Sequence, residues 1–299
     1  MPIQVAEEVQ VALATRRPVV ALESTIIAHG LPWPRNFEVA QALEGAVRDG
    51  GATPATVAVV AGVARVGLDV AALEAIARDG KAYPKAGAPD LAVAIARRAN
   101  AATTAAATID VAAQVGIAIV ATGGIGGVHR GAPWDVSNDL AVLANQPIAV
   151  VSSGAKAILD LNRTAEMLES MGVLLVGYRT SEFPAFYTPW SGIPLEHRVE
   201  TVAEVAAVMR ARFELGQGGV LICNPIPEEA ALDPKLIEDV VARALEHAAA
   251  SGVRGKALTP FLLRELEEST HGATVTANQV LAVSNARVAA EIAVAFART

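Results

Sequence analysis

Residues Val150-Val151-Ser152-Ser153-Gly154-Ala155-Lys156 indicate the fold class and contain the most informative residue of the chain. Its apolar, β-branched start predicts a buried strand, Ser-Ser-Gly predicts a turn, and Lys156 is expected to open a helix. Turns of this kind lie at the carboxyl ends of strands, where open α/β sheets bind their ligands. A lysine placed there is partly removed from water and close to helix N–H groups, which is the setting that a Schiff-base nucleophile needs.

Strands and helices alternate on both sides of this stretch. Short apolar runs predict strands at 19–22, 57–61, 117–121, 147–151, 173–177 and 219–223. Helical periodicity predicts helices at about 5–13, 36–48 (with Asn36 as its cap), 69–79, 89–98, 104–115, 157–171, 201–214, 234–250 and 274–297. Such alternation predicts an α/β fold, with a largely parallel sheet and helices on both faces. No linker or repeat is visible, so we expect one domain over residues 1–299.

The composition excludes several classes of protein. The 299 residues are 53% hydrophobic and carry a net charge of −7 with no basic block, which argues against a nucleic-acid partner. The lone Cys223 reads as a packed strand residue, and one cysteine forms no internal disulfide, as in a reducing compartment. The start of the chain is acidic where a signal peptide is basic, and no uncharged apolar stretch is long enough to span a bilayer. We therefore expect a soluble, cytoplasmic protein.

The densest polar cluster is Thr122-Gly123-Gly124-Ile125-Gly126-Gly127-Val128-His129-Arg130-Gly131. It follows an apolar run, so its backbone N–H groups can cradle an oxyanion. It matches neither the dinucleotide-binding glycine pattern nor a P-loop. A flexible connector is the alternative, but His129 and Arg130 beside these glycines favour a small anion site.

A second cluster, Asp135-Val136-Ser137-Asn138-Asp139, places two carboxylates four residues apart around a hydroxyl and an amide. Oxygen ligands of this kind suit Mg²⁺ or Mn²⁺. The alternative is that Asp135 caps a helix beginning near Ser137, and the spacing alone favours that interpretation.

Two charged residues stand at other strand ends. Glu23 closes the first apolar run, where a partly buried carboxyl can hold a proton near neutral pH, although a buried ion pair is the competing interpretation. Lys85 can pair with a phosphate or be solvated. The irregular segment 179–198 can be a lid or an oligomer contact, but a surface loop is the commoner case.

Several long motifs, in order over nearly the whole chain, resemble the pseudouridine-5'-phosphate glycosidases, also called the indigoidine synthase A-like family. The motifs are Ala21-Leu22-Glu23-Ser24-Thr25-Ile26-Ile27-Ala28-His29-Gly30-Leu31-Pro32, the run from Thr122 to Gly131, Ser153-Gly154-Ala155-Lys156, Phe183-Pro184-Ala185-Phe186, Asn224-Pro225-Ile226-Pro227-Glu228-Glu229 and Thr259-Pro260-Phe261-Leu262-Leu263.

The resemblance implies a three-layer α/β/α fold with a mixed sheet, a homotrimer, and a divalent metal, typically Mn²⁺. It implies reversible cleavage of pseudouridine 5'-phosphate to uracil and ribose 5-phosphate. It makes Lys156 the Schiff-base nucleophile, Glu23 the proton donor and Asp135 the metal ligand. The substrate contacts that it implies are Lys85, the backbone around Ala105, Ser137, Asn138 and Asp139, with His129 and Asn278 near the sugar phosphate.

The chain departs from the family pattern in two places. Lys85 is followed by Ala86-Gly87-Ala88-Pro89-Asp90-Leu91, where the family usually has Ser-Arg-Arg-Asp-Leu, so two guanidinium groups and a hydroxyl are missing. The segment before Asp135 is also shorter than usual. The changed residues 86–89 keep open a C-glycosyl synthase that joins ribose 5-phosphate to another carbon nucleophile. A non-catalytic sugar-phosphate-binding protein is a further alternative, against which Glu23, Lys156 and Asp135 together argue.

Overall fold

Within residues 3–255 and 258–298, which the computed structural model describes, a mixed sheet of 11 strands forms the centre of the molecule. The strands are β1 (Ile3–Val5), β2 (Val19–Leu22), β3 (Thr53–Val60), β4 (Val63–Val66), β5 (Lys85–Ala86), β6 (Ala101–Thr103), β7 (Ile119–Ala121), β8 (Val128–His129), β9 (Ala132–Val136), β10 (Ala149–Ser152), β11 (Leu159–Asp160), β12 (Leu174–Tyr178), β13 (Arg198–Val199) and β14 (Val220–Cys223). The main path of the large sheet runs β1-β4-β3-β2-β7-β10-β14-β12-β13, and β6 and β5 are added beside β3. The pairs β3–β4 and β3–β6 are antiparallel, while the central pairs from β3 to β12 are parallel. A separate small sheet has the order β11-β8-β9.

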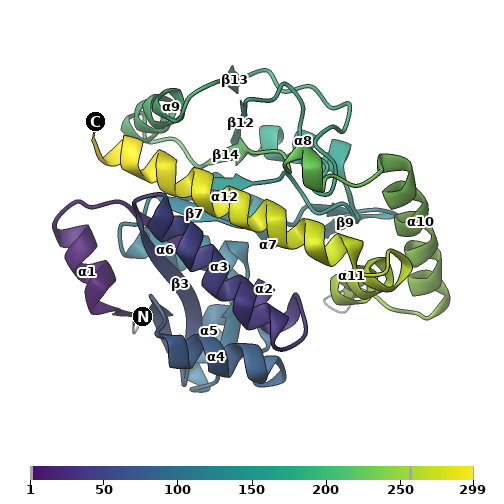
Figure 1. Cartoon of the computed structure of the whole chain (residues 1–299), viewed down its shortest axis with the longest axis horizontal. Helices are drawn as coiled ribbons and strands as arrows, with labels where there is room; N and C mark the ends of the chain where they lie inside the picture. The colour runs from purple at the N-terminus through teal and green to yellow at the C-terminus, as the bar shows by residue number, and fades with distance from the viewer. Residues whose placement is uncertain (1–2, 256–257, 299) are drawn as a thin grey trace.

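Helices cover both faces of the large sheet, which gives the three expected layers (Figure 1). On one face α12 crosses β2, β7 and β10 and packs against α3 and α9. On the other face α6 packs on β2, β3 and β7, with α5 and α7 beside it. The helices are α1 (Glu7–Ala14), α2 (Thr25–His29), α3 (Arg35–Asp49), α4 (Val70–Arg78), α5 (Ala88–Ala96), α6 (Ala105–Gln114), α7 (Asn138–Asn145), α8 (Leu161–Ser170), α9 (Val202–Glu214), α10 (Pro234–Ala250), α11 (Leu258–Ser269) and α12 (Ala273–Ala297), with short 3-10 helices η1 (Gly80–Ala82) and η2 (Glu228–Ala230).

The predicted α/β fold with a largely parallel sheet is confirmed, and its central strands lie close to their predicted positions. These strands are short runs buried on both faces, so hydrophobicity alone reveals them. The strand predicted at 57–61 begins earlier, at Thr53. It ends at Val60, because Ala61 turns the chain with a φ of 50°. The helices α2 and α11 were not predicted.

Asn36 does not cap α3. It lies inside the first turn of that helix and is buried, and its Nδ2 donates to the carbonyls of Ile27 at 2.8 Å and Ala77 at 2.7 Å. Asn36 therefore joins α2 and α4 to α3.

Lys156 does not open a helix either. Gly154 has a φ of +74°, and the Lys156 N–H donates to the carbonyl of Ile125 at 3.1 Å. The chain then passes through β11, and α8 begins at Leu161 with Asp160 as its cap. The backbone after Gly154 is therefore hydrogen-bonded to the glycine-rich loop, whereas the sequence predicted a helix from residue 157.

The segment 179–198 is not a plain surface loop. Phe183, Phe186 and Tyr187 are buried in it, and the Phe186 N–H donates to the carbonyl of Ser153 at 3.1 Å. A side chain on Gly124 would meet the Phe186 ring at 2.6 Å, so this glycine allows the segment to pack against the loop after β7. The middle of the segment, residues 183–189, is therefore packed into the core, while Trp190 and residues 196–198 are exposed.

Among the described residues, α12 alone has the length and the hydropathy, 1.6 on average, of a membrane-spanning helix. It lies across the central strands and contacts α3 and α9 (Figure 1). Its buried Asn285 bonds to the loops after β7 and β10. The contacts of α12 are those of a core helix, whose apolar residues meet protein.

Candidate active site

The carboxyl ends of β2, β7 and β10 meet at one cavity. From β2 the sheet continues to β3 on one side and to β7 and β10 on the other, so the connections change direction between β2 and β7. Crevices at such points are the usual ligand sites of α/β sheets. Glu23 follows β2, Thr122 follows β7, and Lys156 follows the turn after β10. The topology thus brings the predicted acid and the predicted nucleophile together.

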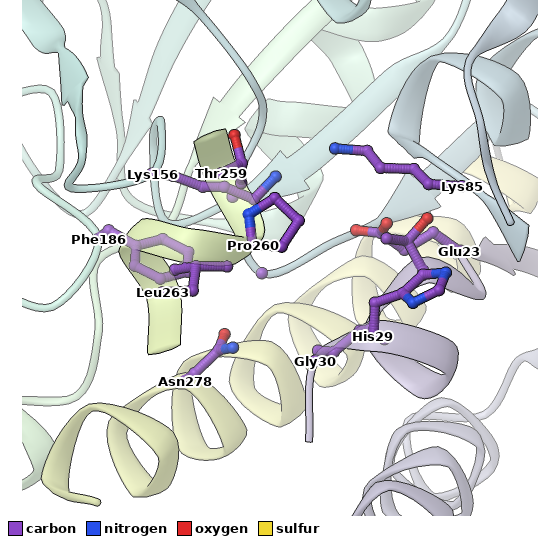
Figure 2. A pocket seen from close by; sticks show the side chains of 14 residues that line it. Glu23, His29, Gly30, Lys85, Lys156, Phe186, Thr259, Pro260, Leu263 and Asn278 are labelled. Carbon is purple, nitrogen blue, oxygen red and sulfur yellow. The ribbon is translucent and has the colours of Figure 1, made fainter. Parts of the chain in front are cut away.

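The cavity has two chambers, an apolar one of about 320 Å³ and a polar one of about 460 Å³. Glu23, Lys85 and Lys156 line both, and so do Thr25 and Thr259. Figure 2 shows the side chains of Lys85 and Lys156 entering from opposite sides, with the Glu23 carboxylate on the side of Lys85. A substrate spanning the chambers would therefore pass these three residues at the junction.

The Glu23 carboxyl is held by Thr122, whose hydroxyl donates to Oε1. Burial raises the pKa of Glu23 above its ordinary value of 4.5, while the Lys156 ammonium and the Thr122 hydrogen bond oppose the shift. A raised pKa keeps a carboxyl protonated closer to neutral pH, which suits a proton donor. The contact between Thr122 and Glu23 was not predicted, because these two residues are 99 positions apart in the sequence.

The polar chamber contains buried polar atoms that have no partner among the described residues. They are Nδ1 of His129 and Oδ1 of Asn138, and both side chains line the chamber. Burial lowers the pKa of His129, although the Asp135 carboxylate opposes this, so the ring favours its neutral form. Buried polar atoms normally have a hydrogen-bond partner, hence this chamber is suited to a polar ligand.

Asp139 uses both of its oxygens within the protein. Oδ1 accepts from the Ala106 N–H at 2.8 Å, and Oδ2 accepts from the Gly126 N–H at 2.7 Å. Asp139 therefore joins the glycine-rich loop to the start of α6. The alternative role of Asp135 as a helix cap is wrong, because Ser137 caps α7 and Asp135 lies in β9.

Arg130 does not belong to the anion site that was predicted at the glycine-rich loop. The Arg130 guanidinium donates to the carbonyls of Leu159 at 3.0 Å and Ala157 at 3.2 Å, and to Glu238 at 2.6 Å. Arg130 therefore faces α10 and does not line either chamber. Ala105, the first residue of α6, does line the polar chamber, where a helix N-terminus favours negative charge.

The polar chamber offers oxygen ligands that suit a divalent ion. No group of three His, Cys, Asp or Glu side chains able to hold a metal occurs in the described ranges. Asp135 offers a carboxylate to the chamber, and Asn138 offers an unpartnered oxygen. Ions such as Mg²⁺ are commonly held by one or two carboxylates, with waters and substrate phosphates completing the shell.

Asn285 positions the loops of the site, a role that sequence reasoning missed. Its Nδ2 donates to the Thr122 carbonyl at 2.9 Å and to the Ser153 hydroxyl at 3.2 Å, while its Oδ1 accepts from Asn224 at 2.8 Å. These bonds join the ends of β7, β10 and β14 to α12. A buried amide within an Ala- and Val-rich helix was the available signal.

The apolar chamber is walled by residues that are distant in sequence. Phe186 comes from the buried middle of the 179–198 segment, Pro260 and Leu263 from α11, and Asn278 from α12 (Figure 2). His29 lies at the same chamber, and its Nε2 donates to the Tyr83 carbonyl at 2.9 Å. Of these residues only Asn278 was predicted as a site residue.

Comparison with known proteins gives consistent results. Residues 8–295 match the family model described as indigoidine synthase A like protein. A pseudouridine-5'-phosphate glycosidase of Caldanaerobacter subterraneus is 52% identical, with 98% of this chain and 96% of the relative covered. One from Myxococcus xanthus is 48% identical, with 100% and 99% covered.

Two solved structures share the fold. A prealnumycin C-glycosynthase in complex with ribulose 5-phosphate matches with a TM-score of 0.92 at 38% identity, covering 100% of this chain and 98% of that one. An indigoidine synthase A-like protein of Thermotoga maritima matches with a TM-score of 0.89 at 37% identity, covering 98% and 96%. The family match and the full-length relatives agree, so the chain belongs to the indigoidine synthase A-like family of enzymes.

Proposed function

We propose that this enzyme reversibly cleaves the C–C glycosidic bond of pseudouridine 5'-phosphate, giving uracil and ribose 5-phosphate. The observation that supports it most is the meeting of Glu23 and Lys156 at the junction of an apolar and a polar chamber. Full-length relatives named pseudouridine-5'-phosphate glycosidase support the substrate. A C–C bond has no leaving oxygen or nitrogen at the base, so the protonation used by ordinary glycosidases is not available.

The first step opens the ribose ring. The neutral amine of Lys156 attacks C1', the C1'–O4' bond breaks, and its electron pair takes the proton of Glu23 to form the 4'-hydroxyl. The raised pKa of Glu23 favours the protonated form that this step requires. Glu23 is left as a carboxylate and can take the extra proton from the Lys156 nitrogen.

The second step breaks the C–C bond. The nitrogen lone pair of Lys156 forms a C=N bond to C1', giving an iminium, while the C1'–C5 electron pair goes to the base and C5 of uracil takes the proton that Glu23 accepted from the nitrogen. Water then adds to the iminium, which releases ribose 5-phosphate and restores the amine, and the proton set free returns to Glu23. The reverse sequence makes the C–C bond from the same two products.

Residues of the polar chamber would hold the phosphate end. We assign this role to Lys85, His129, Ser137, Asn138 and the N–H groups at Ala105, with Asp139 positioning the loop that bears them. Asp135 and Asn138 would hold a divalent ion, which when bound supplies positive charge that orients water and the base. Asn278 would contact the substrate from α12.

Release of uracil tests the proposal directly. The purified protein is incubated with pseudouridine 5'-phosphate and Mn²⁺, and uracil and ribose 5-phosphate are quantified by chromatography. Equal amounts of both products are expected. Absence of uracil under these conditions, in a protein that is folded by circular dichroism, would contradict the assignment.

A C-glycosyl synthase is the second candidate. The C-glycosynthase structure and the segment after Lys85 favour it. Gly87 and Pro89 line the polar chamber and offer no side-chain donor, and a side chain on Gly87 would lie 3.8 Å from the unpartnered Asn138 oxygen. Initial rates with ribose 5-phosphate and uracil, against aromatic carbon nucleophiles, separate the two. A higher kcat/KM for an aromatic acceptor would replace the first assignment.

Removal of divalent metal is expected to abolish turnover. The ligands that we assign in the polar chamber, Asp135 and Asn138, are oxygens, so Mn²⁺ should restore activity better than Zn²⁺. The measurement is uracil release after treatment with a chelator, followed by addition of each ion. Full activity of the metal-free sample would exclude the metal.

Loss of the 5'-phosphate is expected to weaken turnover strongly. A lost charge-assisted hydrogen bond costs roughly 1.5–3 kcal/mol, or about ten- to a hundredfold. The comparison is kcat/KM for pseudouridine 5'-phosphate and for pseudouridine. Because residues 86–89 lack the usual arginines, the ratio should be smaller than for relatives that keep them. Equal values would show that the polar chamber binds no phosphate.

We also propose that the enzyme is cytoplasmic and works as a homotrimer. A buried, unpaired Cys223 fits a reducing compartment. Light scattering coupled to size-exclusion chromatography measures the mass in solution, and a monomeric or dimeric mass would exclude the trimer.

A further inference from the structure

A cleft of about 510 Å³ lies at the opposite end of the sheet from the candidate active site. Val19 and Ile119, the first residues of β2 and β7, line it, whereas Glu23 and Thr122 follow the other ends of these strands. Its other walls come from the end of α1, the segments that lead into β2 and β7, α9 and the end of α12. The two sites therefore share the sheet but no residues.

Arginines dominate the polar lining of this cleft, which we call the arginine cleft. They are Arg16, Arg17, Arg210 and Arg298, and among the described residues no Asp or Glu lines it. The whole chain has a net charge of −7, so this cluster departs from the overall charge. Within residues 3–255 and 258–298, Arg16, Arg17 and Arg298 form no ion pair.

The cleft also has an apolar wall. Leu13, Ile117 and Phe296 line it, and the Arg210 guanidinium lies 5.1 Å from the centre of the Phe296 ring. Arg210 is fixed there by donating to the Phe296 carbonyl at 3.0 Å. Arg16, Arg17 and Arg298 are exposed, so their guanidinium groups can turn toward a ligand.

We propose that the arginine cleft is a second binding site, for a phosphorylated small molecule of nucleotide size. Guanidinium groups bind phosphate in a bidentate manner, and the apolar wall suits the flat face of a base. A volume of about 510 Å³ lies within the usual range of small-molecule pockets. This inference does not depend on the activity proposed above.

The test is equilibrium dialysis of the full-length protein with labelled AMP. The variant Arg16→Gln/Arg17→Gln removes two charges from the cleft. The matched control, Arg97→Gln/Arg98→Gln, removes another exposed pair, directly after α5, and Arg98 has a φ of 52° where Arg16 has 54°. Neither pair lines the active-site chambers, so uracil release should be unchanged in both variants.

The wild-type protein and the control variant are expected to bind AMP equally in the cleft. In Arg16→Gln/Arg17→Gln the affinity of this site should fall roughly ten- to a hundredfold. Arg298→Gln, a single substitution on another element, should weaken binding as well. The proposal is overturned if AMP does not bind at millimolar concentrations, if the cleft variants bind it as the wild type does, or if the control weakens it equally.

Discussion

Borohydride added together with ribose 5-phosphate is expected to leave a permanent adduct on Lys156. Reduction converts the C=N bond of the proposed imine into a stable amine, so the sugar stays attached. Peptide mapping by mass spectrometry locates the adduct. Lys156 is the expected site because it follows β10 at the junction of the two chambers.

Substitution of Lys156 gives the matching loss of turnover. Lys156→Ala should lower kcat by about four orders of magnitude or more, since the covalent step loses the amine that attacks C1'. The fold should persist, because the Lys156 side chain is only partly buried. Lys156→Arg should be equally inactive, because a guanidinium keeps its charge but does not lose a proton.

Lys85 is the control for this assignment, since it is the other lysine at the junction (Figure 2). Lys85→Ala should raise KM and still form the adduct on Lys156. An adduct on Lys85, or appreciable turnover by Lys156→Arg, would show that the nucleophile is assigned to the wrong lysine.

Glu23→Gln is expected to lower kcat by roughly a hundred- to ten-thousandfold, the usual contribution of a general acid. The amide keeps the shape of the side chain and can still accept the Thr122 hydrogen bond, but it has no acidic proton to give.

A matched control is Glu44→Gln. Glu44 also accepts from a threonine hydroxyl, at 2.6 Å from Thr56, and burial raises its pKa too, but it lines neither chamber. Glu44→Gln should keep full turnover, and equal losses in both variants would contradict the role of Glu23.

The raised pKa of Glu23 predicts the direction in which kcat/KM changes with pH. Its pKa is raised in the folded protein, so kcat/KM should fall as pH rises through that pKa and the proton is lost.

The stability of the fold should also fall as pH rises. The raised pKa of the Glu23 carboxyl contributes stability that is fully present below the unfolded value of 4.5 and is lost as pH rises through the folded pKa. Tm of Glu23→Gln should therefore exceed that of the wild type at alkaline pH and approach it in acid. A lower Tm of the variant at alkaline pH would mean that the carboxylate is stabilised.

The fold could be predicted largely from local patterns. Central strands such as 19–22 and 219–223 are uniformly apolar because both faces of the sheet are covered, and the helices between them follow the 3.6-residue period. The patterns failed where a long-range bond outweighed local preference. Asn36 looked like a cap but bonds to α2 and α4, and the loop around Lys156 is held by Ile125 instead of continuing as a helix.

The α/β class, the strand ends that carry Glu23 and Lys156 and, through long motifs, the family could all be predicted from the amino-acid pattern. The arrangement of the site residues came from the folded chain alone. The fold placed Thr122 on the Glu23 carboxyl, committed both oxygens of Asp139 to backbone amides, and turned Arg130 away from the cavity. The physical reason is that hydrophobic periodicity reports which face of an element is buried. The partners of a polar side chain, by contrast, are fixed by contacts between residues that are distant in sequence, and these leave no local pattern.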